Sequence, residues 1–92
     1  MPVKVCELRH IRSLEQFYNE LQTQLLLPAR FGRNLDALYD CLANDVAGPF
    51  ELVWRDTAEA RQGMGADVYA TVLEILETVA EERGDVTLDI HH

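Results

Sequence analysis

Three short segments with the composition of β-strands constrain the fold most, because longer segments of helical character separate them. They run from Val3 to Leu8, from Phe50 to Arg55 and from Val86 to Ile90. Strands separated by helical crossovers pair in parallel, with the helices packed against the sheet. The sequence therefore predicts an α/β fold with a three-stranded parallel sheet and helices packed against it. With 92 residues, the chain is expected to form a single domain, residues 1–92.

Polar caps, glycines and prolines set the expected ends of the helices. Ser13 and Gln16 form a capping box at the start of the first helix, and Pro28 stops that helix near Leu26. The later expected caps and stops are, in chain order, Asp56, Gly63 or Gly65, Asp67 and Gly84. In the last helix the residues expected to face inward are Val68, Val72, Ile75, Leu76 and Val79.

An acidic helix is predicted from Leu35 to about Val46, with Asn34 as its N-cap. Its buried stripe is expected to consist of Leu35, Leu38, Leu42 and Val46. Asp36 and Asp40 lie on the flank away from this stripe, and Tyr39 lies at its border. Neither aspartate has a Lys or Arg three or four residues C-terminal to it to offset the repulsion between the two like charges. This flank is therefore predicted to bind a cationic partner.

Acidic residues outnumber basic residues by two to one. The 16 Asp and Glu against 8 Lys and Arg give a formal net charge of −8. Because phosphate contacts need clusters of Lys and Arg, this charge disfavours nucleic acid as a ligand, and it also disfavours an anionic membrane surface. It favours fast, salt-sensitive association with a basic macromolecule, although acidity also serves solubility alone.

The cysteines and the N-terminus carry no signal for metal binding or export. Cys6 and Cys41 have neither C-x-x-C nor zinc-finger spacing. The first four residues lack an apolar signal segment, and no run approaches the length of a membrane span. We therefore expect a cytoplasmic protein without metal or cofactor. Its two thiols are expected to be reduced, although the sequence leaves a disulfide open.

Many residues of the chain match the sequence pattern of one known protein family. The matches are densest between residues 32 and 42, where they are Gly32, Asn34, Leu35, Asp36, Ala37, Leu38, Asp40, Cys41 and Leu42. Further matches are Ile11, Arg12, Ser13, Pro28, Pro49, Trp54, Arg55, Asp85 and Thr87. On these residues the chain resembles the barstar family, whose members are intracellular inhibitors of a small, basic, secreted ribonuclease. The resemblance implies that the acidic helix and its preceding loop enter the active-site cleft of the enzyme. It places Asp40 where the substrate phosphate binds, makes Asp36 a second contact, and implies a cis Gly48–Pro49 peptide.

At several predicted contacts the chain differs from the family pattern. Arg30 replaces an aromatic residue, Arg33 a glutamate, Thr78 an acidic residue, and Tyr39 and Asp45 each replace a tryptophan. These differences favour a ribonuclease other than barnase, or another basic protein, as the partner. The predicted partner-binding residues are Arg30, Phe31, Gly32, Arg33, Asn34, Asp36, Tyr39, Asp40, Asn44, Asp45, Glu74 and Thr78.

The residues leave several alternatives open. Arg30 and Arg33 either pair with Asp36 or contact an acidic patch on the partner. Catalysis is disfavoured, because the two carboxylates share one convex helix face and no nucleophile is paired with a base. Asp36, Asp40 and Asn44 form a column of oxygen ligands that could hold Ca²⁺ or Mg²⁺ only weakly.

The alternative function is an interaction or regulatory module that kept the fold and no longer inhibits a nuclease. For either function we expect a protein that is monomeric when free.

Overall fold

The computed structural model describes residues 3–28 and 31–91, and its strands and helices follow the predicted order. The elements are β1 (Lys4–Leu8), α1 (Leu14–Leu25), α2 (Leu35–Asp40), η1 (Cys41–Asp45), β2 (Phe50–Trp54), α3 (Thr57–Met64), α4 (Ala66–Arg83) and β3 (Val86–Ile90). The strands form one parallel sheet in the order β1-β2-β3. The predicted α/β fold with a three-stranded parallel sheet is confirmed.

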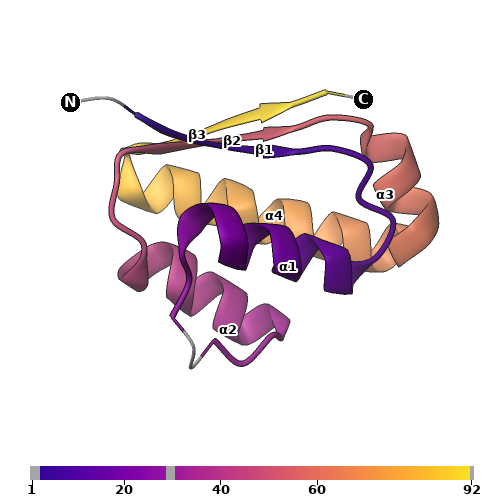
Figure 1. The fold of residues 1–92 in the computed structure, drawn as a ribbon, viewed down its shortest axis with the longest axis horizontal. Helices are drawn as coiled ribbons and strands as arrows, with labels where there is room; N and C mark the ends of the chain where they lie inside the picture. Colours follow the sequence, from indigo (N-terminus) through magenta and orange to yellow (C-terminus); the bar gives the residue numbers. More distant parts are fainter. Residues whose placement is uncertain (1–2, 29–30, 92) are drawn as a thin grey trace.

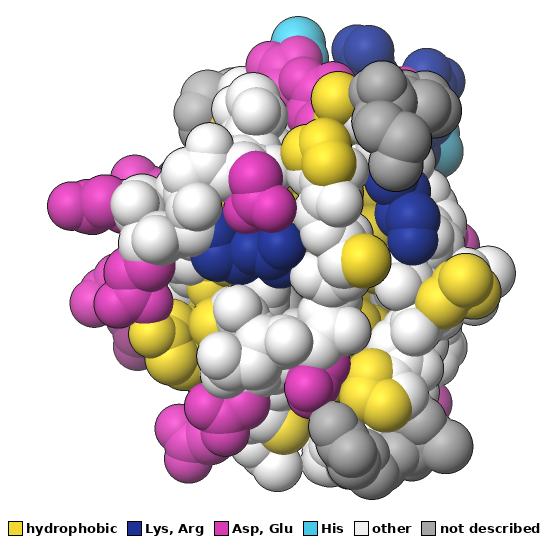
Figure 2. All heavy atoms as spheres, turned by 90° about the vertical axis from the view of Figure 1, so that its left-hand side faces the viewer, with side chains coloured by type: hydrophobic (Ala, Val, Ile, Leu, Met, Phe, Trp, Pro, Cys, Tyr) yellow, Lys and Arg dark blue, Asp and Glu magenta, His cyan; other side chains and the backbone are white. Residues whose placement is uncertain are grey.

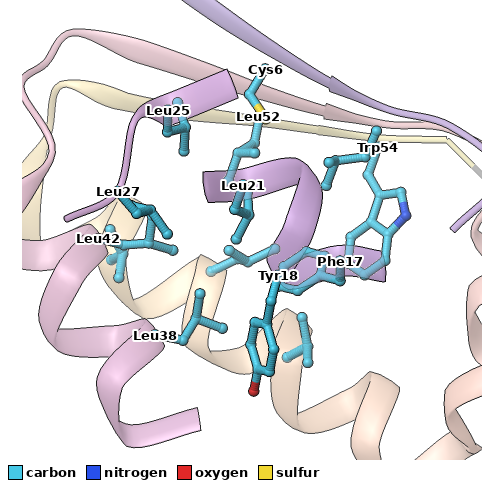
Figure 3. Packing of buried hydrophobic residues seen from close by; sticks show 14 of the residues in the cluster. Cys6, Phe17, Tyr18, Leu21, Leu25, Leu27, Leu38, Leu42, Leu52 and Trp54 are labelled. Atoms are coloured by element: carbon cyan, nitrogen blue, oxygen red, sulfur yellow. The ribbon is translucent and has the colours of Figure 1, made fainter. Parts of the chain in front are cut away.

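The helices α1, α2 and α4 lie on one face of the sheet, and α3 lies beyond the ends of the strands (Figure 1). Alternate strand residues point to this helical layer, so Cys6, Leu52 and Trp54 are buried. Figure 3 shows Trp54 beside Phe17 of α1, and the two rings stack with their centroids 5.0 Å apart. The core therefore lies between the sheet and the helices.

Local capping signals position α1 as predicted. The Ser13 hydroxyl accepts a hydrogen bond from the Gln16 backbone N–H at 3.1 Å. The Gln16 side chain reaches back one residue further than a capping box requires, because its Oε1 accepts from the Arg12 backbone N–H at 2.6 Å. The helix ends at Leu25, and Leu26 takes the left-handed conformation.

The predicted acidic helix begins at Leu35 and is divided in two. Its first six residues are α-helical, and from Cys41 the winding widens into the π-helix η1, which ends at Asp45. Leu38, Leu42 and Val46 are buried as predicted, and Leu35 is partly buried. The apolar stripe thus holds α2 and η1 against the core.

The later elements show where sequence signals were misread. Of the two predicted stops of α3, Gly65 is confirmed as its C-cap, whereas Gly63 lies inside the helix. Gly65 is also the N-cap of α4, which begins at Ala66. Asp67 therefore lies in the first turn of α4 and is not its cap. The Asp56 side chain makes no capping hydrogen bond, although Asp56 precedes α3 as predicted, because its own backbone is in the left-handed region (φ 58°).

Several smaller predictions also have outcomes in the structure. The Gly48–Pro49 peptide is cis, and Gly84 ends α4 in the left-handed conformation. Cys6 and Cys41 are both buried and are not joined by a disulfide. Burial, with a smaller contribution from the Glu20 charge, raises the pKa of the Cys6 thiol to about 12.

Within residues 3–28 and 31–91, none of the helices combines the length and apolar character that a bilayer span needs. Across the same residues, no three His, Cys, Asp or Glu side chains gather closely enough to hold a metal ion.

Candidate protein-binding site

The outer flank of α2 carries two exposed carboxylates. Asp36 and Asp40 are exposed, whereas Leu38 on the opposite side of the helix is fully buried. No ion pair within the described part of the chain involves either aspartate. The two negative charges therefore face solvent from a helix that is fixed by its buried side.

The loop before α2 is held by the predicted N-cap. Asn34 Oδ1 accepts a hydrogen bond from the Ala37 backbone N–H at 2.8 Å, and the Asn34 side-chain amide donates to the Gly32 carbonyl at 3.3 Å. A Cβ at Gly32 would lie 3.1 Å from the Asn34 Nδ2 atom, which is tighter than ordinary contact. Gly32 and Asn34 thus shape the start of the acidic helix.

Arg33 turns away from the acidic flank and binds α1. Its Nη1 donates to the Gln22 side-chain oxygen, and its Nη2 donates to Asn19 Oδ1 at 2.8 Å and to the Glu15 carbonyl at 3.4 Å. The guanidinium also lies 5.6 Å from the centroid of the Tyr18 ring. These contacts fix the loop to the helix that precedes it in the chain.

The contacts of Arg33 bear on one of its two predicted roles. The side chain binds α1 and does not pair with Asp36, and its contact with a partner stays a prediction. The neighbouring Phe31, a predicted partner contact, is 5% exposed and packs edge-on against Tyr18 with centroids 5.4 Å apart. The prediction for Arg30 lies outside the described residues.

The C-terminal end of the acidic helix contacts the last turn of α4. The Arg83 Nη1 atom donates to the carbonyls of Leu42 at 2.9 Å and Val46 at 2.7 Å. These carbonyls belong to the helix end, where intrahelical partners run out. Sequence reasoning missed this contact, because it joins segments that lie 37 and 41 residues apart in the chain.

The remaining predicted residues lie on α2, η1 and α4. Asn44 and Asp45 are exposed at the end of η1, and the Asn44 side-chain amide donates to the Asp40 carbonyl at 3.2 Å. On α4, Glu74 is exposed, whereas Thr78 is partly buried and its hydroxyl donates to the Glu74 carbonyl at 2.8 Å. The Thr78 hydroxyl is thus engaged within its own helix.

Tyr39 joins α2 to α4. Its hydroxyl donates a hydrogen bond to the exposed carboxylate of Glu82. This bond raises the pKa of Tyr39 above its usual value, and burial and the charges of Glu82 and Asp40 raise it further. Tyr39 therefore bonds a carboxylate of α4 to the helix that carries Asp36 and Asp40.

Alkaline titration should report this Tyr39–Glu82 bond. The folded protein holds the phenol proton more tightly than the unfolded chain, so the free energy of unfolding should fall as the pH rises above about 10. In Tyr39→Phe this decline should be smaller, and in Glu82→Gln the Tyr39 pKa should return towards its usual value. Phenolate absorbance and denaturant melts at several alkaline pH values measure both effects. An identical decline in wild type and Tyr39→Phe would contradict the expectation.

Figure 2 shows acidic side chains along the left and lower edges of the face on which the C-terminal ends of η1 and α4 lie. The exposed side chains of Asp36, Asp40 and Glu82 offer carboxylate oxygens as acceptors for cationic side chains. Arg and Lys of a partner form short, charge-assisted hydrogen bonds with such groups. The arrangement is suited to binding a basic surface.

Comparison with known proteins shows the family of the chain. Residues 1–91 match the model of the family described as Barstar (barnase inhibitor). A protein of Bacillus subtilis (strain 168) named "Putative ribonuclease inhibitor YrdF" is 36% identical over 78 residues, which cover 84% of each chain. The chain belongs to the barstar family.

Proposed function

We propose that this protein inhibits a small basic ribonuclease by placing the outer flank of α2 in the active-site cleft of the enzyme. Asp40 would occupy the place of the substrate phosphate, and Asp36 would pair with a second cationic residue. The observation that carries the proposal is the exposure of both carboxylates on a fixed helix, with no ion pair to either from the described residues. Membership of the barstar family and the name of the relative support it.

Electrostatics explains why such a surface suits a ribonuclease. An enzyme that cleaves RNA presents cationic groups to a phosphate, and a fixed carboxylate among them replaces a phosphate oxygen. The net charge of −8 steers the chain towards such a basic surface. The Arg33 guanidinium is bonded to side-chain and carbonyl oxygens of α1 and forms no ion pair with Asp36.

The residues around Asp36 and Asp40, here called the rim of the site, influence which ribonuclease is bound. Tyr39, Asp45 and Thr78 replace residues of the barstar pattern, and Tyr39 is already bonded to Glu82. The proposed partner is therefore a basic ribonuclease other than barnase, with a cleft shaped for this rim. The proposed place of action is the cytoplasm, where the inhibitor would protect the cell that makes it.

Inhibition assays with a panel of small basic microbial ribonucleases test the proposal. We expect wild type to block RNA cleavage by at least one of them, and the affinity to fall steeply between low salt and 1 M salt, where the Debye length shrinks to about 3 Å. Titration calorimetry at several salt concentrations measures the affinity. Failure to inhibit any enzyme of the panel, or an affinity independent of salt, would contradict the proposal.

A further inference from the structure

We infer that Arg33 and Arg83 form a two-arginine clamp that holds the acidic helix, α2 with η1, at both ends. Both are positioning residues, since they act through the helix and do not face the proposed partner. The part of this inference that concerns partner affinity rests on the proposed function. The clamp itself is a property of the free protein.

The acidic helix needs external support because it is short. It has six residues in α2 and five in η1. Isolated helices shorter than about 12–15 residues are marginal in water. Leu38 and Leu42 anchor one side of the helix in the core, as Figure 3 shows, but side-on packing alone leaves the carbonyls and amides of its two ends without partners.

At the N-terminal end, Arg33 ties the loop to α1 through three acceptors. Two are the side-chain oxygens of Gln22 and Asn19, and the third is the Glu15 carbonyl. Arg33 itself has a left-handed backbone (φ 53°), which is uncommon for a residue with a Cβ. Its side-chain contacts compensate for this conformation and direct the chain into the Asn34 cap.

At the C-terminal end, Arg83 bonds the helix carbonyls of Leu42 and Val46 from a largely buried position, with 15% of its side chain exposed. Asp85 fixes the guanidinium through two bonds of 2.9 Å, to Nε and Nη2. The guanidinium also lies 5.2 Å from the centroid of the Phe50 ring.

Gly48 keeps the space beside this cluster open. A Cβ at that position would lie 2.0 Å from Asp85 Oδ2 and 2.7 Å from Arg83 Nη2. The absence of a side chain at residue 48 thus permits the Arg83–Asp85 pair.

The acceptors of the clamp explain how two cations can support an acidic binding surface. On the acidic helix and α1, both arginines donate to neutral amide and carbonyl oxygens, so neither guanidinium pairs with Asp36 or Asp40. Lysine keeps the charge but not the planar set of donors that makes several bonds at once. Replacement by lysine therefore separates geometry from net charge.

Hydrogen exchange on the free protein tests the clamp. In Arg83→Lys and in Arg33→Lys, the amides of α2 and η1 should exchange about tenfold faster, because bonds to a charged donor are lost. Amides of β2 and α4 should keep their wild-type rates, and the exposed control Arg61→Lys should change neither group. Unchanged exchange in α2 and η1, or an equal increase throughout the chain, would overturn the clamp.

A second variant keeps the test decisive if Arg83→Lys does not fold. Asp85→Asn preserves the shape of the side chain and weakens its hold on Arg83, so it should accelerate exchange of the η1 amides more than those of α1. An increase confined to α1, or none at all, would count against the clamp.

Binding kinetics test the effect on the partner. Against a ribonuclease that wild type inhibits, each lysine variant should dissociate about tenfold faster with an unchanged association rate, because the net charge is the same. Wild-type dissociation rates in both variants would overturn the positioning role. If wild type inhibits no ribonuclease, the proposed function fails, and hydrogen exchange still decides the clamp.

Discussion

Replacing Asp40 by alanine is expected to weaken binding to the partner ribonuclease about thirtyfold to several thousandfold. The proposed complex buries this carboxylate among cationic groups, and its removal leaves those groups buried without a partner. Barnase and barstar themselves are among the complexes on which this range was measured, so the range is a property of the family as much as of buried charge pairs in general. Calorimetric titration at a single salt concentration measures the change.

Three further variants show whether charge or helix stability is responsible. Asp40→Asn keeps the shape and should lose nearly as much affinity as Asp40→Ala. Asp67→Ala removes an exposed aspartate from the first turn of α4, as Asp36→Ala does in α2, so the two share the loss of a favourable helix-dipole interaction. Of these two variants, only Asp36→Ala should weaken binding. Wild-type affinity in Asp40→Asn, or equal losses in Asp36→Ala and Asp67→Ala, would contradict the proposed site.

Replacing Gly63 by alanine is expected to destabilise the fold by about 3 kcal/mol or more, because overpacking at a rigid contact is costly. A Cβ on Gly63 would lie 1.7 Å from the Arg12 carbonyl oxygen, and the backbone there cannot move aside as a flexible side chain could. The residue belongs to α3, so this close approach holds α3 against the segment between β1 and α1. Denaturant unfolding measures the loss.

The sign of the Gly63→Ala effect distinguishes this explanation from helix propensity. In an exposed helix without close neighbours, alanine is more favourable than glycine by about 1 kcal/mol. The neighbouring exposed position supplies the control, and Gln62→Ala should change stability little. A Gly63→Ala protein as stable as wild type, or more stable, would show that α3 does not pack on Arg12 in this way.

The predictions that the structure confirms rest on local patterns. The alternation of Val86–Ile90 coincides with β3, and Ser13 and Gly84 begin and end their helices as predicted, because strand periodicity and caps depend on adjacent residues. The exposed flank of Asp36 and Asp40 also follows from helical spacing alone. Whether these aspartates bind a partner stays a prediction.

The features that the sequence did not indicate depend on contacts between distant segments. Gly63 was one of two predicted helix stops, beside Gly65, because its approach to the Arg12 backbone cannot be seen in a local pattern. Pairing with Asp36, three residues away, was one of the two roles predicted for Arg33, but its acceptors lie 11 to 18 residues earlier in α1. The contacts of Arg83 span 37 and 41 residues for the same reason.

The most direct test of the central proposal, that the acidic flank fills the active-site cleft of a ribonuclease, is a displacement experiment. A labelled oligonucleotide that the enzyme binds but cannot cleave is first placed in the active site, and the protein is then titrated in. The proposal predicts complete release of the oligonucleotide, with an apparent affinity of the protein that falls in proportion to the oligonucleotide concentration. A stable complex of enzyme, oligonucleotide and protein together would contradict it.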